Sequence, residues 1–233
     1  MRGHSDQIDF TTLWVLVALF GATWLLWDTP IVYPIKIFVV VLHELGHALA
    51  ALLTGGQVLG IQIFSDEGGI TFTRGGWPFV ILSAGYPGSL LAGSMLLYLS
   101  SRRRWGRGLM IVLAILITAC TLVFFRNAFG VFYGLLVAVA LWFSAYRLSA
   151  EINRQIVRFI AVASCLYALL DIRSDLFVAA PLTSDVVNDA EALSALTGIP
   201  AIVWAILWTA VSFVVLGLFL KSTLRAGPSA HAM

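Results

Sequence analysis

Charged residues are scarce in this chain of 233 residues: Asp, Glu, Lys and Arg together make up 11% of it. A soluble domain normally carries about 25% charged residues, so the scarcity argues against a water-soluble fold. The net charge of +2 is also too small for a nucleic-acid surface, and we expect no nucleic-acid partner. Cysteine is limited to Cys120 and Cys165, both in apolar segments, and we expect small core residues without a disulfide.

Hydrophobic residues make up 60% of the chain, and its mean hydropathy is +0.95. This composition predicts an all-α polytopic membrane protein that forms a single domain over residues 1–233, with its core at 34–220 and a disordered tail from about 222. Seven apolar segments approach the thickness of a bilayer, at 11–27, 34–54, 78–100, 108–125, 129–146, 156–171 and 199–220. Several are shorter than about 20 residues, so one of them is alternatively a re-entrant helix.

Basic residues gather in the short connections between these segments and predict the orientation of the protein. They are Arg102, Arg103, Arg104, Arg107, Arg147, Arg154, Arg158, Lys221 and Arg225. By the positive-inside rule these connections lie in the cytoplasm. With seven crossings, the C-terminus is then cytoplasmic and the N-terminus lies outside. We expect an integral protein of the plasma (inner) membrane that has the lipid bilayer as its surroundings; the sequence does not set its oligomeric state.

A β-hairpin is predicted between the second and third apolar segments. Ile61 and Ile63 alternate with a polar residue, a turn sequence follows at 66–69, and apolar residues alternate again over 70–73. An exposed strand edge can bind an extended peptide through main-chain hydrogen bonds. Ile61 and Ile63, in the stretch 57–64, are therefore candidate substrate-binding residues, with 70–74 as the alternative edge; a purely structural hairpin fits the pattern equally well.

The most specific chemical signal is the pentapeptide His43-Glu44-Leu45-Gly46-His47 inside the second apolar segment. On a helix the two histidines lie one turn apart on the same face, so they can bind one Zn²⁺ ion with Glu44 beside it as general base. Catalytic zinc takes three protein ligands and lowers the pKa of a bound water to about 7. Ionisable side chains inside a membrane are costly, which favours a functional role over a chance match.

The third zinc ligand is expected to be a carboxylate, because the only other histidines, His4 and His231, lie in the terminal tails. Asp171, at the end of the sixth apolar segment, is the preferred candidate. It lies roughly 24 Å along that helix, and His47 lies roughly 20 Å along the second, at about 1.5 Å per residue. The other candidates are Asp175, Asp189 and Glu191.

Asn127, in the connection between the fourth and fifth segments, is a candidate substrate-binding residue. Its side-chain amide could orient an oxyanion or a substrate carbonyl. The alternative is an anchor at the membrane interface with a local helix cap.

Several stretches together resemble the site-2 protease superfamily of intramembrane zinc metallopeptidases, in particular its compact branch without a PDZ domain. They are His43-Glu44-Leu45-Gly46-His47-Ala48, Leu53-Thr54-Gly55-Gly56, Ala84-Gly85-Tyr86-Pro87-Gly88, Arg126-Asn127-Ala128-Phe129-Gly130, Asp171-Ile172-Arg173-Ser174-Asp175, and Asp189-Ala190 with Thr197-Gly198-Ile199-Pro200 and Trp204. The resemblance implies a zinc peptidase that cuts in or near a transmembrane segment, with His43 and His47 as ligands and Glu44 as base. The superfamily's Asn-x-x-Pro and Leu-Asp-Gly pattern is not matched here, since Ile172 follows Asp171, and the third ligand stays open between Asp171 and Asp189.

The expected function is therefore a zinc metalloendopeptidase that hydrolyses a peptide bond of a membrane-protein substrate. Two alternatives remain. The same pocket could bind a metal or a partner helix without catalysis, or the buried charges could mark the ion path of a transporter, for which the sequence lacks the inverted repeats.

Overall fold

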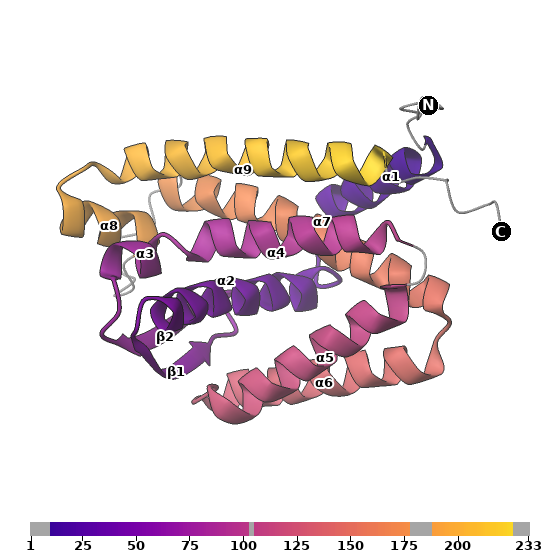
Figure 1. Cartoon of the computed structure of the whole chain (residues 1–233), viewed down its shortest axis with the longest axis horizontal. Coiled ribbons are helices and arrows are strands. Elements are labelled where there is room, and N and C mark those ends of the chain that lie inside the picture. The colour runs from indigo at the N-terminus through magenta and orange to yellow at the C-terminus, as the bar shows by residue number, and fades with distance from the viewer. Residues whose placement is uncertain (1–9, 103–104, 178–187, 226–233) are drawn as a thin grey trace, which may run out of the picture.

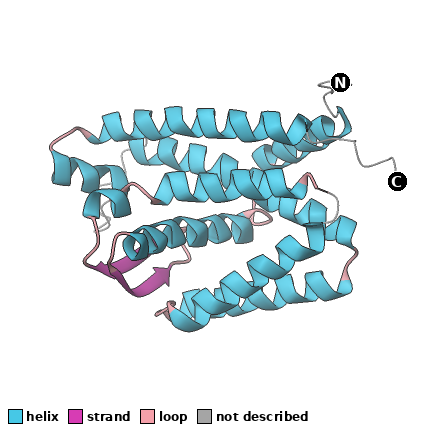
Figure 2. Cartoon of the chain, viewed as in Figure 1, coloured by secondary structure: helices cyan, strands magenta, loops and turns pink. Residues whose placement is uncertain are grey.

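The computed structural model of the chain describes residues 10–102, 105–177 and 188–225, and helices dominate this part. Its elements are α1 Phe10–Leu25, α2 Tyr33–Leu53, β1 Gln57–Ile63, β2 Gly69–Arg74, α3 Pro78–Leu82, α4 Gly85–Ser100, α5 Gly106–Val123, α6 Ala128–Arg147, α7 Ala150–Phe177, α8 Asp189–Thr197 and α9 Ala201–Arg225. The fold class expected from the sequence is confirmed at this level: helices predominate, and one short hairpin follows α2 (Figure 2).

Helix α2 lies inside the bundle, with α4 along one side and the α5–α6 pair on the other (Figure 1). Its segment from Ile37 to Leu42 is buried on all sides, and every residue in this segment is apolar. Helix α4 also packs closely against α7 and α9. The contact with α7 is close because Gly93 has no side chain, and the space of a Cβ there is taken by Ser164 and the carbonyl of Ala161.

Four of the described helices are long and apolar enough to cross a membrane, namely α2, α5, α6 and α9. This supports an integral membrane protein, whereas the predicted number of seven spans stays a prediction. The expected segment 78–100 is divided into α3 and α4, because the helix ends at Leu82 and a new one begins at Gly85. This division places a short helix beside the end of α2, where it takes part in the site described below.

The expectation that the N-terminus lies on the opposite side of the membrane from the C-terminus stays a prediction. Leu16 of α1 packs near Leu220 of α9, and the ring of Trp27, just after α1, packs at a tilt against that of Tyr167 in α7. Helix α1 therefore runs toward the hairpin end of the molecule, in the same direction as α2 (Figure 1). Its 16 residues reach only about 24 Å, less than the roughly 30 Å of a bilayer core.

The predicted hairpin is confirmed: β1 and β2 pair antiparallel, with Ile61 opposite Thr71 and Ile63 opposite Gly69. In the turn, Glu67 adopts a left-handed φ of 69° and the N–H of Phe64 donates to the carbonyl of Gly68 over 2.9 Å. A two-stranded hairpin alone is at best marginally stable, so it requires support from its surroundings. Here α2 packs against both strands, which places the hairpin beside the His-Glu-His segment.

Candidate metal centre

His43, Glu44 and His47 all lie in the second half of α2, and their potential ligand atoms are within 4.8 Å of one another. Glu44 and His47 are buried, whereas His43 is slightly more exposed. The two imidazole rings lie 4.8 Å apart between centroids, as the spacing of four residues on a helix requires. The helix face that the sequence predicts to bind a metal is thus formed inside the protein.

Two neighbouring elements orient the imidazoles. Nδ1 of His47 lies 2.7 Å from the backbone carbonyl oxygen of Ile81 in α3. Because a carbonyl only accepts, Nδ1 carries the proton and donates it, which leaves Nε2 with a lone pair for a metal. His43 packs edge-on against Tyr86 of α4, with 4.7 Å between ring centroids. The break between α3 and α4 therefore supplies supports for both rings.

The carboxylate of Asp189 completes the group. Its Oδ2 atom lies 3.1 Å from Nε2 of His43 and 3.2 Å from Nε2 of His47. Asp189 is the first residue of α8, and its position depends on a capping box in which Asn188 accepts from the N–H of Glu191 and Glu191 bonds back to Asn188. Leu193 then buries α8 against a cluster that contains Tyr86 and Trp204. This packing holds the start of α8 over the two histidines.

The donor set fits a tetrahedral zinc ion. With Zn–N and Zn–O bonds of about 2.0–2.1 Å, neighbouring ligand atoms of a tetrahedron lie about 3.3 Å apart, close to the two separations from Asp189. Oδ2 is buried and receives no hydrogen bond from a described residue, and the Nε2 atom of His47 that faces it is an acceptor. Acceptors gathered at such distances need a proton or a cation between them.

Asp189 is held in the form that a metal requires. Burial raises the pKa of its carboxyl, but the neighbouring His47 and His43 rings, in their protonated form, outweigh this effect and hold the pKa well below its ordinary value. The carboxylate is therefore ionised at neutral pH.

Gly85, the first residue of α4, leaves the space in which the three groups meet. A Cβ atom there would lie against Nε2 and Cε1 of His43 and 2.6 Å from Oδ2 of Asp189. Only glycine leaves this point open, so the backbone of α4 forms one wall of the candidate metal site.

Glu44 is bound from the opposite side by β2. The hydroxyl of Thr71 donates to Oε2 of Glu44 over 2.6 Å. The carboxylate also lies against Gly69, where a Cβ would be 2.6 Å from Oε1. Neither residue was among those predicted from the sequence, because their role depends on how the hairpin docks on α2.

A cavity of about 380 Å³ opens beside these groups. It is lined by the site residues His43, Glu44, His47 and Asp189, by β2 and its preceding turn, and by apolar side chains of the helices that include Val40, Ile81, Leu82, Tyr86 and Tyr167. A cavity of this size accommodates a few residues of an extended peptide next to the carboxylate of Glu44.

The edge of β1 is not free, which corrects the expectation for Ile61 and Ile63. Both side chains are fully buried, and Ile61 pairs its N–H with the carbonyl of Phe124 and its carbonyl with the N–H of Arg126. Ile63 is bonded through its own backbone to the side chain of Asn127. A peptide therefore cannot add to this edge without displacing the connection between α5 and α6.

Asn127 acts as an anchor of the hairpin in the structure. Its Nδ2 donates to the carbonyl of Ile63 over 2.6 Å, and its Oδ1 accepts from the N–H of Ile63 over 3.2 Å. Both ends of the amide are thus bonded to β1, and the side chain makes no cap bond to α6.

Replacement of Asn127 by alanine is expected to lower the free energy of unfolding by about 1–3 kcal/mol, because it leaves a backbone donor and acceptor of Ile63 without partners. Urea or thermal unfolding in a fixed detergent measures this loss. Asn127→Asp retains one acceptor, so its free energy of unfolding should lie between those of the wild type and the alanine variant. An alanine variant as stable as the wild type contradicts the anchoring role.

The position of Asp171 is described only for the backbone. It lies in α7, near the end of that helix, and its side chain is outside the described part of the structure, as is that of Asp175. Among the described carboxylates outside α2, the one that meets both imidazoles is that of Asp189. The described geometry supports Asp189 as a ligand, whereas the choice of Asp171 stays a prediction.

A family model described as peptidase M50B-like matches residues 16–219, which is most of the chain and includes α2, the hairpin and α8. The chain belongs to the peptidase M50B-like family. This result confirms the resemblance to site-2 proteases that the sequence motifs indicated. Comparison of the family member with curated proteins and with solved structures finds no match.

Proposed function

We propose that this M50B-like protein is a zinc-dependent intramembrane endopeptidase that cleaves a membrane-protein substrate in or near a transmembrane segment. The observation that carries the proposal is the meeting of His43, His47 and Asp189 beside the buried Glu44, on a helix apolar enough to span a membrane. His43, His47 and Asp189 would hold one Zn²⁺ ion. When bound, zinc supplies a Lewis acid that activates water and polarises the scissile carbonyl.

We assign the other steps of catalysis to residues of the chain itself. Glu44 lies next to the proposed ligands and takes the proton of the attacking water, then returns it to the nitrogen of the leaving amine. The cavity keeps a short stretch of substrate away from bulk solvent, where proton transfer and electrostatic stabilisation are most effective. Because the edge of β1 is occupied, β2 is the strand that we propose to bind an extended substrate segment.

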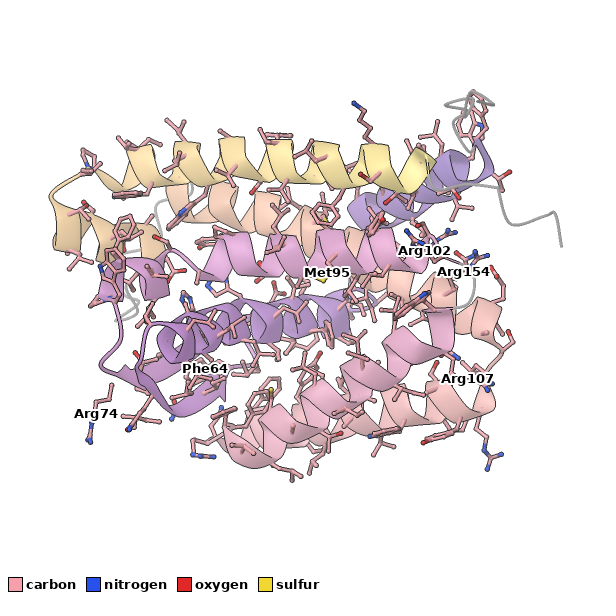
Figure 3. The ribbon with its side chains drawn as sticks, in the orientation of Figure 1. Phe64, Arg74, Met95, Arg102, Arg107 and Arg154 are labelled. Atoms are coloured by element: carbon pink, nitrogen blue, oxygen red, sulfur yellow. The ribbon has the colours of Figure 1, made fainter. Side chains whose placement is uncertain are left out.

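Orientation in the membrane follows from the charges. Arg102, Arg107 and Arg154 lie at the end of the bundle away from the hairpin, whereas Phe64 and Arg74 lie at the hairpin end (Figure 3). By the positive-inside rule we propose that the former end faces the cytoplasm, together with the end of α9, in the plasma (inner) membrane. The metal centre and hairpin then lie toward the opposite side.

The test of this function is hydrolysis by purified, zinc-loaded protein. The probes are fluorescein-labelled casein, whose unfolded segments are already extended, and a set of single-span peptides in liposomes. We expect both the release of peptides and the incorporation of ¹⁸O from labelled water into the new carboxyl ends.

Glu44→Gln is the decisive variant in this assay. Glutamine keeps the shape of the side chain but cannot accept the proton, so we expect the rate to fall about 10²- to 10⁴-fold while zinc content stays unchanged. If the wild type releases no peptide from any probe, or if Glu44→Gln cleaves as fast as the wild type, the protease proposal fails. Zinc binding without hydrolysis would instead favour a binding role for the same pocket.

A further inference from the structure

Strand β2 contacts the Glu44 carboxylate and restricts the position of both of its oxygens. The hydroxyl of Thr71 lies 2.6 Å from Oε2 and 3.0 Å from the main-chain carbonyl of Glu44, but it has a single hydrogen to donate. A bond to the ionised group is the stronger of the two, and the shorter distance agrees with it. The hydroxyl therefore binds the carboxylate.

Gly69 supplies the second constraint. It precedes Thr71 by two residues, so both face the same side of β2. A Cβ at Gly69 would lie 2.6 Å from Oε1 and 2.7 Å from Cγ of Glu44, so the carboxylate rests on bare backbone. One residue of the strand binds the first oxygen, and another makes room for the second.

The strand that carries these contacts is itself fixed to the bundle. Thr71 pairs across the hairpin with Ile61, whose backbone is bonded to Phe124 and Arg126. The hydroxyl of Thr71 is thereby held by elements other than α2. Its position relative to Glu44 is set by the packing of the whole hairpin, which is what a positioning contact requires.

We propose that Thr71 is a positioning residue that aligns the Glu44 carboxylate for proton transfer. This inference rests on the proposed protease function and adds a residue to it. A glutamate side chain has several rotatable bonds, and a general base is effective only when its oxygen is within hydrogen-bond reach of the proton it takes. The bond from Thr71 selects one rotamer before the substrate arrives.

Thr71→Val and Thr71→Ser test the inference with the casein probe. Valine keeps the branched shape but has no hydroxyl, so we expect kcat to fall about 10- to 100-fold with KM and zinc content unchanged. Serine keeps the hydroxyl, so kcat should return to within about threefold of the wild type. Thr121→Val, which removes a buried hydroxyl in α5 that donates to the carbonyl of Ile117, controls for the general cost of this exchange.

The outcomes separate the two proposals. Glu44→Gln is measured beside the Thr71 variants, and an inactive Glu44→Gln with a fully active Thr71→Val overturns the role of Thr71 alone. Three other results also overturn this role, because each indicates a merely structural residue. They are a loss of zinc in Thr71→Val, a rise in KM in place of the fall in kcat, and a fall in kcat for Thr71→Ser as large as that for Thr71→Val. A fully active Glu44→Gln overturns the proposed function itself.

Discussion

Replacement of Asp189 by alanine is expected to strip the protein of zinc and to abolish hydrolysis. The variant leaves two imidazoles on α2 without the carboxylate that lies 3.1 and 3.2 Å from them. Loss of an outer residue that only orients a ligand costs about 10- to 100-fold in metal affinity, so loss of a direct ligand should cost at least about 100-fold. Metal analysis after dialysis against a weak chelator measures the change.

The matched control is Asp171→Ala, which removes the carboxylate that the sequence alone favoured. It should retain one zinc per chain and activity close to that of the wild type. Loss of zinc from Asp171→Ala together with its retention in Asp189→Ala would contradict the assignment and return the third ligand to α7.

Substitution of Gly85 by alanine should reduce zinc binding and hydrolysis as strongly as loss of Asp189 does, although glycine has no side chain that could bind a metal. The added methyl would lie against Nε2 of His43 and 2.6 Å from Oδ2 of Asp189, in the space where the proposed ligands converge. The backbone of α4 cannot shift freely, because it is packed closely against α7, where Ser164 and the carbonyl of Ala161 occupy the space of a Cβ at Gly93. We expect zinc content and hydrolysis to fall to background, while the helical circular dichroism spectrum is kept.

Gly108→Ala is the control for this substitution. Gly108 lies in α5 with no atom within 4 Å of an added Cβ, so alanine should be neutral or slightly stabilising there. A Gly85→Ala protein with full zinc content and normal turnover would show that the ligands do not meet at this point.

The two histidines and the glutamate could be predicted from the sequence because their geometry is local. A spacing of four residues on a helix brings His43 and His47 to one face, whatever the rest of the chain does. The hairpin was predictable for the same reason, since alternation over 57–63 and 69–74 is a property of neighbouring residues.

Asp189 could not be found in this way. A depth argument favours Asp171 among the acidic candidates because it is the one attached to an apolar segment, and such an argument has no means to place a short helix that folds back over α2. The one local signal was Asn188 with Glu191, the capping box that starts α8. What decides the position of Asp189 is the burial of Leu193 and Ala190 beside Tyr86, a contact between segments distant in sequence.

The roles of Thr71 and Asn127 could not be predicted from the sequence either. An amide between two apolar segments was interpreted as a group that faces substrate, and the hydroxyl of Thr71 carried no signal at all. Both are explained only by the docking of the hairpin between α2 and the start of α6, where Asn127 bonds β1 and Thr71 bonds Glu44. Such pairings depend on tertiary packing, which single-sequence patterns do not encode.

The origin of the third carboxylate in α8 also governs when the proposed metal site can form during synthesis. A nascent chain that has inserted only α2 carries paired imidazoles without an acidic partner, and it stays incompetent until α8 has been translated and folded back. Metal capture then tethers an early helix to a late one. Zinc would thus report that the chain has been translated through α8, and a product truncated before α8 would lack the proposed third ligand.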